Sequence, residues 1–166
     1  MTRWTAVLIA LPLLLTSPAR ALEPLTRIIA QPGSPIRITA YGAAYQEGAP
    51  NSPEGIRHTV AYENAGTRAM SAVEISMVSF DVWNEFLDRT PGLTIRDLTP
   101  GAADKRTWVV HSEGDFSFQT AIAYVSRVRF TDGTFWSADV RAIGTELKKV
   151  QKDFDVANLD HKASKP

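Results

Sequence analysis

Three acidic and two aromatic side chains lie close together between positions 81 and 88, where they could do chemistry. Asp81, Glu85 and Asp88 surround Trp83 and Phe86. Paired carboxylates beside aromatic rings suit glycoside hydrolysis, and carboxylates also bind cations. The segment lacks the Asp-x-Asp-x-Asp-Gly order of a calcium loop, so a solvated loop or helical turn is the simpler interpretation. We therefore predict no metal site, no cofactor and no catalytic residue set.

Two histidines are the other candidates for acid–base chemistry. His58 lies on the apolar side of a strand-like segment, which favours a core or edge histidine over a ligand or base. His111 is followed by Ser112, Glu113 and Asp115. Residues so close in sequence on one turn do not form a catalytic triad, and we expect a solvated turn.

Arginine and tryptophan define a third candidate site near the C-terminal end of the chain. Asp132-Gly133 separates two strand-like runs, 121–130 and 134–142, and predicts a hairpin with a two-residue type I′ turn. That turn places Arg129 opposite Trp136 and puts Arg127 on the same face. An exposed guanidinium–indole stack contributes about 0.5–1 kcal/mol. We predict a binding surface made of Arg127, Arg129 and Trp136.

The rest of the hairpin and the other tryptophans indicate where the core lies. With the two-residue turn, Val128, Phe130 and Phe135 share the opposite, core-facing side of the hairpin. Trp108 is expected in the core, as large aromatic residues fill sandwiches generally.

Short strand-like segments separated by turn residues run along most of the chain. Residues 56–62 alternate apolar and polar side chains, and residues 71–83 do the same with a change of phase at Met77-Val78 that predicts a β-bulge. Further strands are expected within 26–45, at 93–98 and at 106–111, with a short helical turn at 83–87 that Pro91-Gly92 ends. The pattern predicts an all-β, immunoglobulin-like antiparallel β-sandwich with a short C-terminal helix.

Both ends of the chain differ from this central part. Residues 6–15 (AVLIALPLLL) follow Arg3 and precede Ala19-Arg20-Ala21, which is typical of a secretory signal peptide cleaved after Ala21. The apolar run is too short for a membrane span, and no later segment reaches spanning length. At the other end, Leu147, Val150 and Phe154 have helical spacing within 145–155. This helix could dock on the sandwich, which we favour, or engage a partner.

The predicted organisation is therefore a signal peptide (1–21), an N-terminal extended segment and loop (22–55), a sandwich core (56–143) and an amphipathic helix with a frayed tail (144–166). The 166-residue chain has 18 basic and 18 acidic residues and no cysteine. Removing residues 1–21 takes away Arg3 and Arg20 and no acid, so the product has 16 basic and 18 acidic residues, a net charge of −2. This balance argues against nucleic-acid binding. The lack of cysteine excludes disulfides, thiolate metal sites and a cysteine nucleophile.

The order of these segments resembles the FxLYD-type and related immunoglobulin-like domains of exported bacterial proteins. The resemblance rests on the segments 60–66 (VAYENAG), 72–75 (AVEI), 80–81 (FD), 98–101 (LTPG) before Trp108, and 128–136 (VRFTDGTFW). It covers about residues 56–142, and it implies a fold rather than an activity or a catalytic residue set.

We predict an exported, non-enzymatic binding or accessory module of the cell envelope or medium, periplasmic or secreted. Its partner would be another envelope or secreted protein, or a glycan. The alternative is a carbohydrate-active or hydrolytic domain that uses Asp81, Glu85 and Asp88 near Trp83. A purely structural subunit, in which sheet edges pair between chains, is the third possibility.

Overall fold

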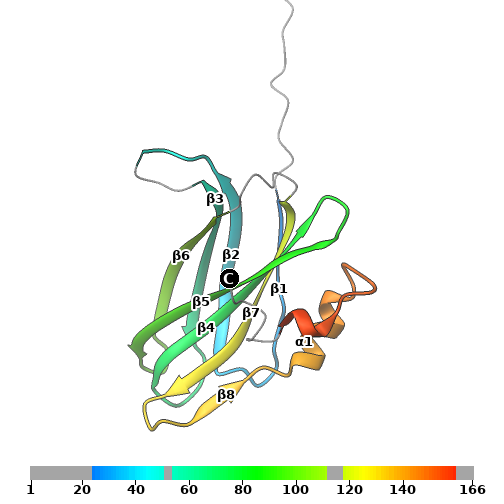
Figure 1. Ribbon diagram of the computed structural model, residues 1–166. Helices are drawn as coiled ribbons and strands as arrows, with labels where there is room; N and C mark the ends of the chain where they lie inside the picture. The colour runs from blue at the N-terminus through cyan, green and yellow to red at the C-terminus, as the bar shows by residue number, and fades with distance from the viewer. Residues whose placement is uncertain (1–23, 51–53, 112–117, 160–166) are drawn as a thin grey trace, which may run out of the picture.

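Two β-sheets face each other, and a short helical segment near the C-terminus covers part of the larger sheet (Figure 1). The computed structural model describes residues 24–50, 54–111 and 118–159. The strands are β1 (Leu25–Ile28), β2 (Ile36–Gln46), β3 (Gly55–Asn64), β4 (Met70–Asp81), β5 (Phe86–Leu98), β6 (Ala103–His111), β7 (Phe118–Phe130) and β8 (Phe135–Ser137). The helices are α1 (Val140–Leu147) and the 3-10 helix η1 (Val156–Leu159).

The strand order confirms the predicted all-β sandwich with a short C-terminal helix. One sheet has the order β1-β7-β4-β5, with β8 also paired to β7, and the other has the order β2-β3-β6. All pairs are antiparallel except β1 with β7, which run parallel. Among the described residues, no helix has the length and hydrophobicity that a membrane span requires.

The core between the sheets is built from alternate residues of the central strands. Val73, Ile75 and Met77 of β4 face the smaller sheet, as the period of two requires. The remaining buried members of this cluster are Ile36, Val60, Tyr62, Met70, Leu98, Ala123, Val125, Val128 and Phe130.

A second cluster lies on the outer face of the larger sheet, under the C-terminal segment. Val78 and Phe80 of β4 contact this segment, so β4 is apolar on both faces here. The predicted bulge at Met77-Val78 is therefore wrong, because the change of phase reflects burial of both faces. The other buried members are Ile122, Tyr124, Ile143, Leu147, Phe154 and Leu159.

A bulge instead occurs in β7. Glu74 pairs with Arg127 and Ile75 with Val125, so Ser126 has no opposite residue. Because the extra residue shifts the alternation by one, Val125 before it and Val128 after it both face the inner core.

Two further predictions about local structure are wrong. Residues 86–98 form one strand rather than a helical turn, a break and a short strand, because edge strand β5 accommodates Pro91. Gly92 lies against the Trp108 indole, where an added Cβ would lie 2.8 Å from a ring carbon. The predicted strand 134–142 ends at Ser137. The helix, predicted within 145–155, spans Val140–Leu147, so it begins and ends earlier, and Val150 and Phe154 lie beyond it.

Asp139 explains this early start, because its carboxylate accepts hydrogen bonds from the backbone N–H of Arg141 and Ala142 and so forms the helix N-cap. The three residues on which the helix prediction rested do pack on the sandwich. Leu147 and Phe154 are buried and Val150 is partly buried against the same cluster.

Candidate functional site

The loop between β7 and β8 decides which side chains share a face at this end of the sheet. The Phe130 N–H donates to the Thr134 carbonyl at 2.9 Å, and the Gly133 N–H donates to the Phe130 carbonyl at 3.0 Å. Gly133 has a φ of 85°, in the left-handed region that glycine readily adopts. The loop therefore has three residues, 131–133, in place of the predicted two.

The extra loop residue moves the pairing register by one. Arg129 pairs with Phe135, and Val128 pairs with Trp136. A shift of one residue reverses the faces of a strand, so Phe135 points outward and Trp136 packs against the inner core. The predicted surface of Arg127, Arg129 and Trp136 is therefore wrong in its third member, which Phe135 replaces.

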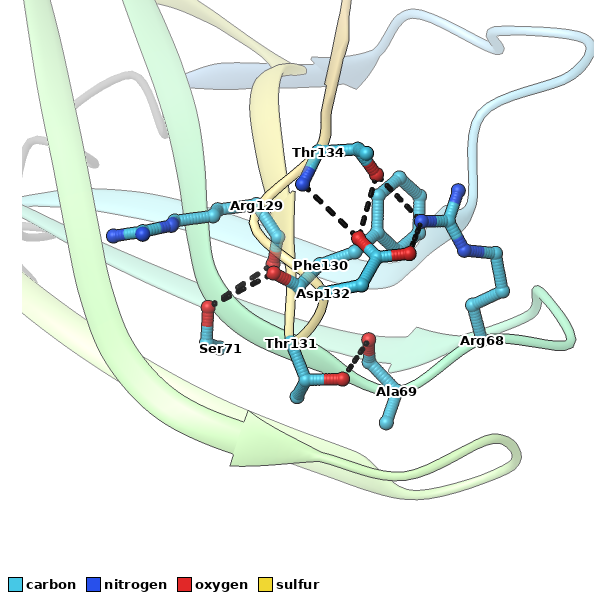
Figure 2. A network of polar contacts seen from close by, with 8 residues as sticks. All are labelled: Arg68, Ala69, Ser71, Arg129, Phe130, Thr131, Asp132 and Thr134. Atoms are coloured by element: carbon cyan, nitrogen blue, oxygen red, sulfur yellow. Dashed lines mark hydrogen bonds and ion pairs between the residues drawn. The ribbon is translucent and has the colours of Figure 1, made fainter.

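A polar network anchors this loop to the turn between β3 and β4 (Figure 2). The Asp132 carboxylate accepts hydrogen bonds from the Thr134 N–H at 3.0 Å and the Thr134 hydroxyl at 2.7 Å, and it forms an ion pair with Arg68. These hydrogen bonds, with the nearby Arg68 charge, lower the pKa of Asp132. The Arg68 guanidinium also lies 3.8 Å above the Phe130 ring. Contacts between the β7–β8 loop and the β3–β4 turn therefore fix the start of β8 and so position Phe135.

Next to Phe135, one buried carboxylate binds two arginines on the outer face of the sheet. Glu74 lies 3.3 Å from buried Arg89 and 2.5 Å from Arg127. Arg89 also donates to the Tyr124 hydroxyl at 3.3 Å. Since Glu74 can neutralise only one of its two partners, and Arg129 is also cationic, this face carries an excess of positive charge.

Exposed apolar side chains complete this face, which we call the β8 face. Phe135 (69% exposed), Leu93 (55%) and Ile95 (80%) are among the most exposed large apolar residues described. The Arg129 guanidinium lies 5.7 Å from the centre of the Phe135 ring. An open cavity of about 200 Å³ lies between Ala72, Glu74, Leu93, Arg127, Arg129 and Phe135. The face combines apolar area with fixed cationic groups, a combination that suits binding.

The acidic candidates at 81–88 have separate local roles. Asp81 is buried, and its carboxylate accepts hydrogen bonds from the backbone N–H of Trp83 and Glu85, both at 2.8 Å. Asp88 accepts a hydrogen bond from the Thr90 hydroxyl at 3.1 Å. Glu85 is exposed, and Trp83 is 79% exposed at the turn between β4 and β5. Asp81 thus organises the turn in this structure.

His58 occupies the position expected of a core histidine. It is 1% exposed, and its Nδ1 lies 2.8 Å from the Tyr41 hydroxyl. Burial lowers the pKa of His58 to about 4, although the charge of Asp88 acts in the opposite direction. Residues 112–115, predicted to form a solvated turn, lie outside the described residues, as do residues 1–21, predicted to form a signal peptide.

A larger cavity, about 480 Å³, lies between β1 and the start of β2. Its lining is mainly apolar, and two of its polar residues already bond to the backbone. The Gln31 amide bonds to both the carbonyl and the N–H of Val125, and the Ser34 hydroxyl donates to the Ile36 carbonyl. Within the described ranges, no group of three His, Asp or Glu side chains is placed to hold a metal ion.

These features define the class of protein: it is a two-sheet β-sandwich in which a C-terminal helical segment partly covers one sheet. No protein-family model matches the chain, and no curated protein matches its sequence. A solved structure of a hypothetical protein from Peptoclostridium difficile 630 is similar, with a TM-score of 0.51 and 12% identity over 70% of this chain and 92% of that chain. This similarity concerns the fold alone.

A second solved structure, Northeast Structural Genomics Consortium target SoR45, has a TM-score of 0.39 and 15% identity. It covers 63% of this chain and 80% of that chain. Its TM-score is too low to support a shared fold.

The prediction misses the exposed position of Phe135 because it requires Asp-Gly to form a complete two-residue turn. The segment Thr131-Asp132-Gly133 is equally compatible with a three-residue loop whose last residue is left-handed, since glycine stands at that position. Leu93 and Ile95 were missed because an edge strand with exposed apolar residues has the same alternation as one that faces a core.

Proposed function

We propose that this protein is an exported, non-enzymatic binding module that recognises a protein partner through the β8 face. The observation that carries this proposal is that exposed Phe135 lines one open cavity together with Arg127, Arg129 and Glu74. The partner would present an apolar side chain flanked by carboxylates. The export part of the proposal rests on the signal-peptide pattern of residues 1–21.

The architecture supports this choice of surface over the others. The outer face of the larger sheet is apolar near Val78 and Phe80, where the chain's own C-terminal segment covers it. Further along the same sheet, Leu93, Ile95 and Phe135 stay exposed without such a cover among the described residues. Aromatic and arginine side chains are enriched at the energetic centres of protein interfaces.

Site-directed photo-crosslinking in the producing cells identifies the partner. A photo-reactive side chain at position 135 should capture a partner that the same group at position 83 does not capture. Trp83 is the matched control because it is equally aromatic and more exposed, and it lies at the β4–β5 turn. Capture of the same proteins from both positions would contradict the assignment of the β8 face.

Affinity measurements with the purified partner then test the chemistry of the face. We expect Arg129→Glu to weaken binding at least tenfold and to reduce its sensitivity to salt, because a cationic group meets carboxylates. Trp83→Ala should leave the affinity unchanged. An unchanged affinity in Arg129→Glu with Phe135→Ala would overturn the proposal. Separately, a product whose N-terminus is Met1 rather than Leu22 would contradict export with cleavage.

A further inference from the structure

The outer edge of β2 differs from the other sheet edges of the molecule. β2 has 11 residues and pairs only with β3 among the described strands. Alternate residues of an edge strand direct their N–H and C=O groups away from the sheet. Along Ala40–Ala44 these groups face the side opposite β3, where no described strand is hydrogen-bonded to β2.

Edge strands usually carry features that prevent pairing with other chains, such as charges, prolines or short length. β5 carries Arg89, Pro91, Arg96 and Asp97, and β6 carries Asp104-Lys105-Arg106. β1 and β8 are only 4 and 3 residues long. By contrast, residues 38–46 (ITAYGAAYQ) contain no charged residue and no proline. A register irregularity in β2 lies between Ile38 and Ala40, so the part of this long edge strand that lacks such protections is Ala40–Gln46.

Gly42, in the middle of this edge, has no internal reason to be glycine. An added Cβ would meet no atom within 4 Å, and its φ is outside the left-handed region. Gly92 and Gly133 differ, since one lies against Trp108 and the other has a φ of 85°. A glycine within a strand weakens the strand unless a bend or the close approach of another backbone requires it. At Gly42 the approach would come from outside the chain.

We propose that β2 pairs with β2 of a second copy of this chain, antiparallel and centred on Gly42. A two-fold axis at this position places Ala40 opposite Ala44 and Tyr41 opposite Ala43. The same axis brings the Arg37 end of one strand to the Glu47 end of the other. The two small sheets join into one continuous sheet with the order β6-β3-β2-β2-β3-β6.

A second copy fits this edge because a two-fold interface must be complementary to itself. Arg37, which also forms an ion pair with Glu63 of its own chain, lies five residues before Gly42, and Glu47 lies five residues after it. An antiparallel arrangement therefore pairs opposite charges at both ends of the contact and leaves its centre uncharged. The β8 face belongs to the other sheet, so dimerisation and partner binding use separate surfaces.

Cysteine crosslinking tests this geometry directly, because the chain has no native cysteine. Directly opposed residues of an antiparallel pair have Cα atoms about 4.5–5.5 Å apart, which a disulfide spans. Under mild oxidation Gly42→Cys should form a covalent dimer in high yield. Thr59→Cys is the matched control, because Thr59 pairs with Gly42 on the same sheet face but lies one strand from the edge.

Light scattering after size-exclusion chromatography gives an independent measurement. The unmodified protein should elute as a dimer that dissociates on dilution, and Ala40→Lys with Ala44→Lys should elute as a monomer with unchanged circular dichroism. The same pair of lysines at Leu93 and Ile95 should leave the dimer intact. A monomer at millimolar concentration, a dimer that survives the Ala40 and Ala44 lysines, or a dimer that Gly42→Cys does not crosslink would each overturn the proposal.

Discussion

Individual side chains in the core show how burial settles a chemical role that residue type leaves open. His58 is a general base or a ligand by residue type, yet it is packed between Tyr41, stacked at 6.1 Å between ring centroids, and Phe118 at 6.5 Å. Burial raises the pKa of the Tyr41 hydroxyl and lowers the pKa of His58. Both rings are therefore neutral near pH 7, and their hydrogen bond is structural.

His58 should make the protein sensitive to mild acid. Its folded pKa of about 4 lies below its ordinary value of 6.5, so the unfolded state binds the proton first as pH falls. The contribution of neutral His58 to the free energy of unfolding is therefore complete only above pH 6.5 and decreases as the pH falls toward 4. Between pH 7.5 and pH 5 this contribution falls by about 2 kcal/mol. Urea unfolding at both pH values should show a smaller loss for His58→Gln. An equal loss in both proteins, or an NMR titration of His58 near pH 6.5, would contradict the assignment.

Among the elements, the β7–β8 hairpin has the largest effect on the candidate site. The left-handed backbone of Gly133 closes a three-residue loop, and the Asp132 network holds it against Arg68. This loop sets the register that exposes Phe135 and turns Trp136 inward. The β8 face therefore depends on the conformation of one glycine.

Substitutions at Gly133 should follow the cost of a positive φ. Gly133→Val should lower the free energy of unfolding by about 1–2 kcal/mol, because a β-branched residue is strained in the left-handed region. Gly133→Asn should cost less, since asparagine tolerates this region. Chemical denaturation measures both. An equal cost for Val and Asn would indicate that φ is not the controlling quantity.

For the whole molecule, the C-terminal segment completes the larger sheet rather than forming an independent tail. Leu147 is fully buried, and Phe154 packs 6.0 Å from Phe80 and 5.6 Å from Phe86 between ring centroids. Gly144 allows the helix to approach η1, since an added Cβ would lie 2.6 Å from a Val156 methyl group. Without this cover, Val78 and Phe80 would face water.

Removing one contact of this cover should therefore destabilise the entire sandwich. We expect Leu147→Ala to reduce the free energy of unfolding by about 2–5 kcal/mol, as for buried leucines generally. Val140→Ala on the same helix should cost far less, because Val140 is 40% exposed. Thermal and urea unfolding compare the two variants. Similar losses in both would show that burial of Leu147 is not the source of the loss, since alanine favours the helix at either position.

The sequence alone determined the fold class, since alternating apolar residues and turn residues indicate strands wherever one face is buried, as in 56–62. It also indicated that Leu147 and Phe154 would pack on the sandwich. Only the tertiary structure decided which face of the sheet each side chain occupies. Three features set this: the register change of one residue at the Gly133 loop, the bulge at Ser126, and the cover over Val78 and Phe80. The physical reason is that a strand's side-chain period is two, so one extra residue in a loop or bulge reverses every face beyond it.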